Sequence, residues 1–161
     1  MANKTHQFTY ELHENESSLS PADHALLQAA REHTAAAYAP YSAFKVAAVA
    51  QTTNGHIVKG TNQENASYPV GICAERVLLS ALSTLHPTEA VATLAISYHN
   101  LHGNSGKPAS PCGMCRQALV EYEQRFNQPM RLILSGQQGE VMVIASAKDI
   151  LPFGFTAEDM K

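Results

Sequence analysis

Apolar and polar positions alternate near the start of the chain. Phe8, Tyr10 and Leu12 are separated by polar residues over residues 6–13. This is the period of a half-buried strand, and its place near a terminus predicts an edge strand. The sequence Ser-Pro-Ala-Asp at residues 20–23 is typical of a helix start, because serine caps, proline suits the first turn and aspartate favours the helix dipole. We expect this helix to end near residue 37.

Apolar runs and helical patterns alternate along the rest of the chain. Asn54-Gly55 between two apolar runs predicts a hairpin turn. The polar stretch 99–110 is expected to be a long loop, and long loops are often functional. Strands are expected at residues 45–51, 57–60, 92–97, 131–134 and 141–145, and helices at residues 74–85, 112–125 and 147–151. This order predicts an α/β fold, a three-layer α/β/α sandwich with a mixed central sheet.

Length and composition are those of one globular domain. The chain has 161 residues, of which 45% are hydrophobic and 16% charged, enough apolar surface for a real core. No apolar run reaches the roughly 20 residues of a membrane span, so no membrane partner is expected. The first residues lack the apolar region of a signal peptide. We therefore expect a cytoplasmic protein.

Charge and cysteine content narrow the function further. The net charge is −3, and the 11 lysines and arginines are scattered, which argues against a nucleic-acid partner. The eight histidines are dispersed, and most are expected at the solvated surface. An odd number of cysteines, three in all, disfavours a disulfide framework and favours a metal or catalytic role.

The three cysteines, Cys73, Cys112 and Cys115, have the spacing of metal ligands. Thiolates select zinc or iron–sulfur clusters, and a cluster held by cysteine alone would need four of them. Three protein ligands with one open position are the arrangement of a catalytic zinc ion. We therefore expect one Zn²⁺ per chain.

The neighbours of the cysteines suit such a site. Each cysteine lies at or near a predicted helix start, where unpaired backbone N–H groups and the helix dipole stabilise thiolates. Three thiolates leave a net negative site around a divalent ion, and Arg76 and Arg116 are candidates to offset that charge. Glu75, two residues after Cys73, could take and return the proton of a zinc-activated water.

Other interpretations stay open at this point. Cys-x-x-Cys alone is also a redox motif, although that leaves Cys73 unexplained. Isolated cysteines are commonly inert core residues, and Glu75 could be a solvated carboxylate of a first helical turn.

Four stretches of the chain together resemble homotetrameric cytidine deaminase. They are Ala-Tyr-Ala-Pro-Tyr-Ser-Ala-Phe at residues 37–44, Asn-Gln-Glu-Asn-Ala-Ser-Tyr-Pro at 62–69, Cys-Ala-Glu-Arg at 73–76 and Pro-Cys-Gly-Met-Cys-Arg-Gln at 111–117. The resemblance covers residues 20 to 160 or so, and it implies a cytidine deaminase-like fold.

The resemblance also implies residue roles. The three cysteines would hold zinc, and a hydroxide would attack C4 of cytosine while Glu75 protonates N3 and later helps ammonia leave, as in zinc deaminases generally. The backbone around Ala74 would contact the pyrimidine, and Phe44 would pack on the base. Asn62 and Glu64 would bind the ribose 3′-hydroxyl. Otherwise Phe44 is a core aromatic, and Asn62 and Glu64 form a solvated strand end.

Assembly follows from the same resemblance. In this family neighbouring subunits complete the active site, so a homotetramer with shared sites is implied, with Phe155 as the C-terminal aromatic and Tyr68 at the subunit contacts. Residues 1–19 extend beyond the common core and carry the edge strand, and residues 20–161 form the deaminase domain. The loop at residues 98–110 is longer than in shorter members, which leaves its effect on substrate choice open.

The expected function is hydrolytic deamination of free cytidine and 2′-deoxycytidine to uridine and 2′-deoxyuridine in pyrimidine salvage. The alternative is that the protein acts on another aminopyrimidine nucleoside, such as blasticidin S. Asn62 and Glu64 argue against this alternative, because they fit a ribose with a free 3′-hydroxyl. The net negative charge of the chain argues against a polynucleotide as the substrate. The presence of Glu75 argues against a further alternative, a non-catalytic module that zinc only stabilises.

Overall fold

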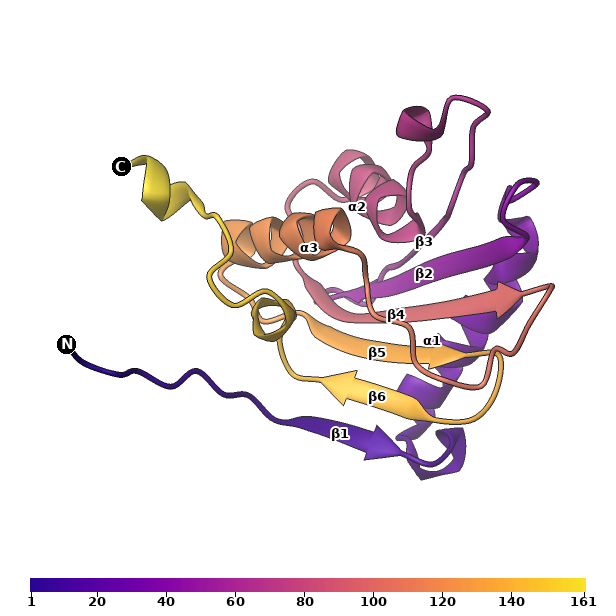
Figure 1. The fold of residues 1–161 in the computed structure, drawn as a ribbon, viewed down its shortest axis with the longest axis horizontal. Coiled ribbons are helices and arrows are strands. Elements are labelled where there is room, and N and C mark those ends of the chain that lie inside the picture. The colour runs from indigo at the N-terminus through magenta and orange to yellow at the C-terminus, as the bar shows by residue number, and fades with distance from the viewer.

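Six strands form one mixed sheet in the computed structural model, which describes residues 1–161. The strands are β1 (Tyr10–His13), β2 (Phe44–Thr52), β3 (Ile57–Thr61), β4 (Val91–Asn100), β5 (Arg131–Gly136) and β6 (Val141–Ile144). Their order across the sheet is β1-β6-β5-β4-β2-β3 (Figure 1). Only β4 and β5 run parallel to each other, and every other neighbouring pair is antiparallel.

Helices cover both faces of this sheet. The helices are α1 (Pro21–His33), α2 (Ala74–Leu85) and α3 (Gly113–Phe126), with short 3-10 turns at Glu16–Ser18, Thr34–Ala36, Tyr68–Val70, Ala147–Ile150 and Ala157–Met160. Helix α1 lies on one face, whereas α2 and α3 lie side by side on the other (Figure 1). The predicted three-layer α/β/α sandwich with a mixed sheet is confirmed. No helix combines the length and apolarity that crossing a membrane requires.

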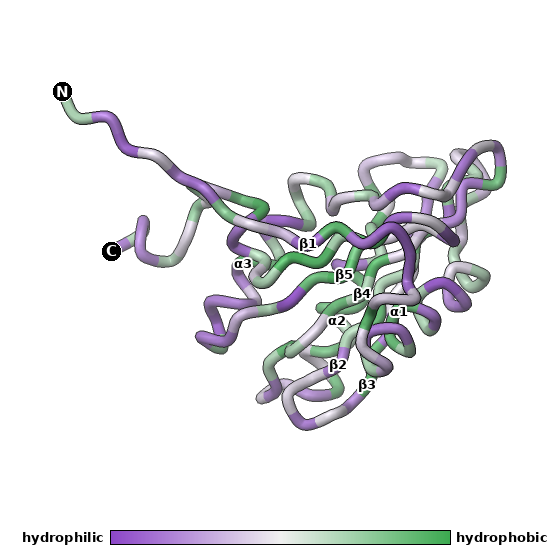
Figure 2. The backbone as a smooth tube through the Cα atoms, turned by 90° about the horizontal axis from the view of Figure 1, so that it is seen from below, coloured by the Kyte–Doolittle hydropathy of each residue, from purple (hydrophilic) through white to green (hydrophobic).

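Two hydrophobic clusters separate the three layers. The larger contains 18 buried residues, among them Leu78, Leu82 and Leu119, between the sheet and the α2–α3 layer. The smaller contains eight and packs Leu27 and Ala30 of α1 on the opposite face. The middle strands are accordingly hydrophobic along most of their length (Figure 2), as expected for strands buried on both faces.

The predicted start of α1 is confirmed, and its predicted end is wrong. The Ser20 hydroxyl accepts a hydrogen bond from the backbone N–H of Asp23 at 3.2 Å, and Pro21 occupies the first turn. Regular α-helix ends at His33, and the 3-10 turn Thr34–Ala36 follows. The tighter turn still buries Ala37, which is why the apolar pattern extends beyond the α-helix.

The N-terminal strand differs from its prediction. Strand β1 is shorter than residues 6–13, and it pairs with β6 at the edge of the sheet. Phe8, which precedes the strand, and Tyr10 and Leu12 within it are 41–54% exposed, so this face is only about half covered. Residues 1–9 run outward on the same side of the molecule as the C-terminus (Figures 1 and 2). The domain division at residue 19 stays a prediction.

Helix α2 packs directly on the backbone of β3 at Gly60. A Cβ atom at Gly60 would lie 2.5 Å from the backbone nitrogen of Leu78 and 2.6 Å from the carbonyl oxygen of Ala74. Both atoms belong to the backbone and cannot rotate away. Only glycine permits this close approach. The contact therefore sets the distance between α2 and the sheet.

Gly60→Ala should therefore lower the free energy of unfolding by about 1–3 kcal/mol, the usual cost of overpacking, because the methyl group pushes α2 away from β3. Denaturant unfolding measures the change. Gly113→Ala is the control, since a Cβ there meets nothing within 4 Å and alanine favours a helix over glycine. Equal stabilities of the two variants would contradict the packing role of Gly60.

Candidate active site

Three thiols from two helix starts meet in one place. Cys73 immediately precedes α2, Cys112 immediately precedes α3, and Cys115 lies in the first turn of α3. The Cys73 and Cys112 sulfurs are 3.9 Å apart, and those of Cys112 and Cys115 are 3.5 Å apart. Zinc–sulfur bonds of about 2.3 Å in a tetrahedron put the sulfurs roughly 3.8 Å apart. The three thiols therefore fit one zinc ion.

Paired backbone holds the stretch around Asn62 beside the cysteines. Gln63 exchanges two backbone hydrogen bonds with Ile72, at 2.9 and 3.0 Å, just before Cys73. On the other side, the N–H of Tyr38 donates to the carbonyl of Asn62 and the N–H of Glu64 donates to the carbonyl of Tyr38. These bonds place Asn62 and Glu64 next to the start of α2.

The thiols have different proton affinities because they share one small volume. A hydrogen bond from Cys115 lowers the pKa of Cys73 to about 6, and the charge of Arg76 contributes a smaller lowering. The same hydrogen bond, together with burial, raises the pKa of the Cys115 thiol. One thiolate therefore forms readily, and a cation at the centre of the three sulfurs would remove the obstacle to the others.

Glu75 lies in the first turn of α2 and is only 4% exposed. Burial raises the pKa of its carboxyl group above the usual value, because a low-dielectric environment disfavours the charged form. A carboxyl group with a raised pKa holds its proton more tightly than an ordinary carboxyl group does, which suits a general acid and base. The solvated-carboxylate interpretation of Glu75 is wrong.

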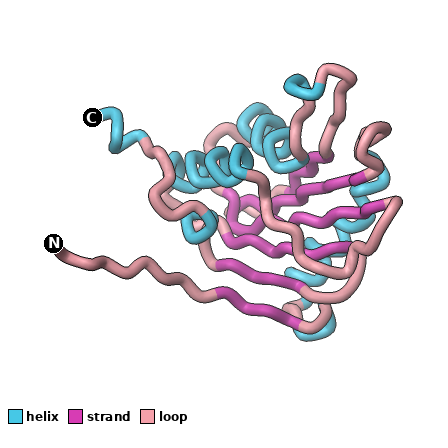
Figure 3. Tube along the Cα trace, in the orientation of Figure 1, coloured by secondary structure: helices cyan, strands magenta, loops and turns pink.

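A cavity of about 210 Å³ joins the thiols of Cys73 and Cys112 to three of the six predicted substrate contacts. Strands β2 and β4, the start of α2 and the end of the loop before α3 form its walls. Its lining includes Phe44, Asn62, Cys73, Ala74, Glu75, Tyr98, Ala109, Ser110 and Cys112. The long loop at residues 98–110 therefore contributes directly to the wall of this cavity, and it is drawn as the connection between β4 and α3 in Figure 3.

Phe44 and Asn62 are held firmly in the cavity wall. The ring of Phe44 stacks on that of Tyr98, with centroids 4.7 Å apart and planes inclined by 10°, which leaves its other face for a ligand. The Asn62 amide donates to the carbonyl of Phe44 at 2.9 Å and accepts from the N–H of Val46 at 2.7 Å. Asn62 thus pins the start of β2, and its amide keeps one N–H and one lone pair for another partner.

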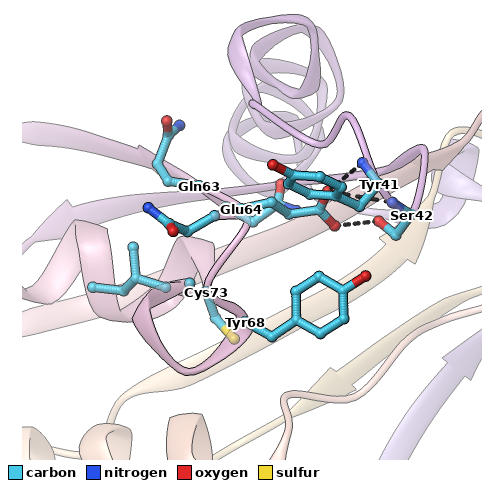
Figure 4. Close-up of a pocket in the computed structure, with 10 residues that line it drawn as sticks. Tyr41, Ser42, Gln63, Glu64, Tyr68 and Cys73 are labelled. Atoms are coloured by element: carbon cyan, nitrogen blue, oxygen red, sulfur yellow. Dashed lines mark hydrogen bonds between the residues drawn. The ribbon is translucent and has the colours of Figure 1, made fainter.

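Glu64 lies in an adjoining hollow of about 450 Å³ that shares Asn62 and Cys73 with the cavity. Its carboxylate accepts hydrogen bonds from the hydroxyl of Ser42 and from the backbone N–H groups of Ser42 and Tyr41 (Figure 4). The Ser42 hydroxyl is the main reason why the pKa of Glu64 is lowered. Glu64 is therefore an oriented anion at the rim of the site.

Aromatic side chains border the same hollow. Tyr68 is 75% exposed, and its ring meets that of Tyr41 edge-on with centroids 5.9 Å apart. Both rings border the open side of the hollow (Figure 4). Phe155 lines neither cavity and is 60% exposed on the C-terminal segment, where its carbonyl accepts a hydrogen bond from Gln117.

The two arginines have different surroundings. Arg76 is half-buried and acts on Cys73 through its charge. Arg116 donates to the carbonyls of Pro111 and Ile150, at 2.8 and 3.1 Å. Arg116 thus ties the segment before Cys112 to the C-terminal part of the chain, a positioning contact that residue spacing does not predict.

Comparison with known proteins agrees with this geometry. The family model for the cytidine and deoxycytidylate deaminase zinc-binding region matches residues 20–127. The chain belongs to this family. The matched region contains the cysteine cluster, which can hold one metal ion. The zinc cofactor expected from the sequence is thereby supported by the family and by the geometry of the three sulfurs.

Several relatives of the deaminase family cover most of the chain. A cytidine deaminase from Halalkalibacterium halodurans is 33% identical over 135 residues, which are 84% of this chain and 95% of that protein. One from Mycobacterium tuberculosis is 35% identical over 134 residues, 81% of this chain and 87% of that protein. The crystal structure of cytidine deaminase from Burkholderia pseudomallei has a TM-score of 0.71 at 39% identity, covering 82% of this chain and 98% of that one.

Five wall residues of this cavity were not predicted individually, namely Val46, Ile96, Tyr98, Ala109 and Ser110. Tyr98 supports Phe44 from β4, and Ala109 and Ser110 close the cavity from the long loop. The period of β4 could have placed Tyr98 on the same face as Ile96, which also lines the cavity. No local pattern indicates which residues of a long loop face a cavity.

Cys115→Ala should abolish zinc binding, because two thiols and water hold zinc far more weakly than three thiols do. Metal analysis of the purified protein should find about one zinc per chain in the parent and a small residual fraction in the variant. Met114→Ala is the control, since Met114 is exposed on the same helical turn. Full zinc occupancy in Cys115→Ala would contradict the three-thiol site.

Proposed function

We propose that the protein is a zinc-dependent hydrolase that deaminates cytidine and 2′-deoxycytidine to uridine and 2′-deoxyuridine, releasing ammonia, in pyrimidine salvage. The observation that carries the proposal is a buried carboxyl group, Glu75, in one cavity with the thiols of Cys73 and Cys112. Membership of the deaminase family and the names of the relatives support the choice of reaction and substrate.

Cys73, Cys112 and Cys115 would hold the zinc ion. When bound, zinc supplies a Lewis acid that makes water nucleophilic at neutral pH. Arg76 lies beside Cys73 and offsets part of the negative charge that three thiolates bring. Arg116 keeps the segment that precedes Cys112 in place.

Glu75 carries the protons of the reaction. Hydrolytic deamination requires a proton at N3 of the pyrimidine as water adds to C4, and another on the amino group as it leaves. The burial that raises the pKa of Glu75 lets one carboxyl group accept a proton from water and deliver it to either nitrogen. No other carboxyl group lines this cavity.

The base and the sugar would occupy the two adjoining hollows. The free face of Phe44 suits stacking on the pyrimidine, and the backbone at Ala74 offers it polar contacts. The remaining hydrogen-bonding capacity of Asn62 and the fixed carboxylate of Glu64 suit the ribose 3′-hydroxyl. Recognition of a free 3′-hydroxyl and a net charge of −3 favour a nucleoside over a polynucleotide.

A homotetramer with shared active sites completes the proposal. Tyr68, which lines the hollow, is 75% exposed, Val70 in the same 3-10 turn is 64% exposed, and Phe155 away from the hollow is 60% exposed. Exposed aromatic side chains beside an open hollow are suited to a subunit interface. In such an assembly Phe155 of one chain would close the site of another.

The compartment and the domain division belong to the same proposal. Three free thiols placed for metal binding suit a reducing compartment, and we place the enzyme in the cytoplasm. Residues 20–161 would form the deaminase domain, with residues 1–19 adding β1 to its sheet.

Glu75→Gln should lower kcat by roughly 10²–10⁴-fold, the usual contribution of general acid–base catalysis, while the protein keeps its zinc. Ammonia release from cytidine and metal analysis of the same sample measure both quantities. Glu121→Gln on the exposed side of α3 is the matched control and should be fully active. A Glu75→Gln enzyme within tenfold of the parent would remove Glu75 from the chemistry.

The shared site predicts complementation between two inactive chains. Phe155→Ala and Glu75→Gln should each be nearly inactive as pure tetramers. After subunit exchange, some sites combine an intact Glu75 with Phe155 of a neighbour, so activity should return. Gel filtration confirms that each variant and the mixture remain tetrameric. A mixture no more active than its components would show that each chain closes its own site.

A further inference from the structure

A second cluster of metal-ligating side chains lies outside the deaminase site. It consists of His56 in the hairpin between β2 and β3, His86 at the end of α2, and Glu89 in the connection to β4. Their ligand atoms all lie within 4.8 Å of one another. Cys73 and His86 flank opposite ends of α2, a helix of 12 residues, so about 18 Å of helix separates this cluster from the cysteines.

Both imidazole rings direct Nδ1 towards the same carboxylate. His56 Nδ1 is 2.9 Å from one Glu89 oxygen, and His86 Nδ1 is 3.5 Å from the other. The rings stack with centroids 4.2 Å apart and planes inclined by 21°, so one ring must turn about its Cβ–Cγ bond before both Nδ1 lone pairs point at one cation. Bonds of about 2.0–2.2 Å from zinc to nitrogen and oxygen put neighbouring ligand atoms roughly 3.4 Å apart in a tetrahedron. The 3.5 Å separation of His86 Nδ1 from the carboxylate lies close to that value, and the 2.9 Å separation of His56 Nδ1 would have to lengthen by about 0.5 Å.

The carboxylate at the centre is held in place. The Glu89 side chain is 10% exposed, and its backbone carbonyl accepts a hydrogen bond from the hydroxyl of Tyr122 at 2.9 Å. Both of its oxygens lie within hydrogen-bonding distance of His56 Nδ1, at 3.0 and 2.9 Å. His56 is held in turn by its backbone N–H, which donates to the Thr52 hydroxyl at 3.0 Å. Such supporting contacts orient metal ligands.

We propose that His56, His86 and Glu89 form a second metal site, which takes one divalent transition-metal cation such as Zn²⁺. Two imidazoles and a carboxylate are ligands that zinc, copper, nickel and iron accept, and the half-exposed side chain of His56 leaves a route for the ion and a position for water.

The site would join three parts of the fold. It ties the tip of the β2–β3 hairpin to the last turn of α2 and to the start of β4. A cation bound only by the folded protein stabilises it in proportion to its concentration above the dissociation constant. The second metal would thus hold α2 at the end remote from Cys73 and Glu75, leaving the chemistry of deamination unchanged.

Zinc titration of the full-length, zinc-loaded enzyme tests the proposal. Equilibrium dialysis with metal analysis should show a second equivalent of Zn²⁺ beyond the one at the cysteines. His56→Gln and His86→Gln should each weaken that equivalent at least tenfold, while kcat and KM for cytidine stay unchanged. His102→Gln is the matched control, because it removes an exposed imidazole from the long loop and should keep the second equivalent.

A thermal melt of the same samples separates folding from binding. Excess Zn²⁺ should raise Tm of the parent and of His102→Gln, and it should leave Tm of His56→Gln unchanged. Two outcomes overturn the proposal: saturation at one zinc per chain, or a second equivalent that His56→Gln and His86→Gln bind as tightly as the parent. The triad would then be only a hydrogen-bonded clamp.

Discussion

The mutual repulsion of three adjacent thiolates is the constraint on which the site depends. The sulfurs of Cys73 and Cys112 are 3.9 Å apart, and that of Cys115 is 3.5 Å from Cys112. The hydrogen bond between Cys115 and Cys73 moves their pKa values in opposite directions, and burial and the negative charges nearby raise that of Cys115 further. Two helix N-termini favour the negative charge, and a divalent cation completes the balance. The fold must hold both helix starts in contact, and the larger core cluster beneath α2 and α3 does so.

Helix α2 connects the metal site to the substrate pocket. Its position over the sheet is set by the contact of its backbone with Gly60, and its first turn carries Glu75 beside Cys73. The segment that leads from β3 into α2 carries Asn62 and Glu64, which backbone pairing holds in place. One short stretch of chain therefore carries residues for proton transfer, metal binding and sugar recognition. A change in the distance between α2 and the sheet would disturb all three.

Features with local causes could be predicted from the sequence, and features with distant causes could not. The bounds of α2 match the prediction, because its start and the proline after its end are local signals. The cysteines and Glu75 meet as expected, because thiol count and spacing limit the choices. The exposure of Phe8 and the ties of Arg116 depend on which elements pack nearby. The histidines were expected at the surface, and the pairing of His86 with Glu89 needs the end of α2 in place.

The most direct test of nucleoside deamination at this site is ammonia release from cytidine and from 3′-deoxycytidine by the zinc-loaded enzyme. If Glu75 acts on the base while Asn62 and Glu64 hold the sugar, cytidine should be deaminated efficiently. Its 3′-deoxy analogue should then show a roughly 10- to 100-fold lower kcat/KM, because polar groups made for the hydroxyl are left unpaired. Equal rates for the two nucleosides would contradict sugar recognition by Asn62 and Glu64, and no ammonia from either would contradict the proposed reaction.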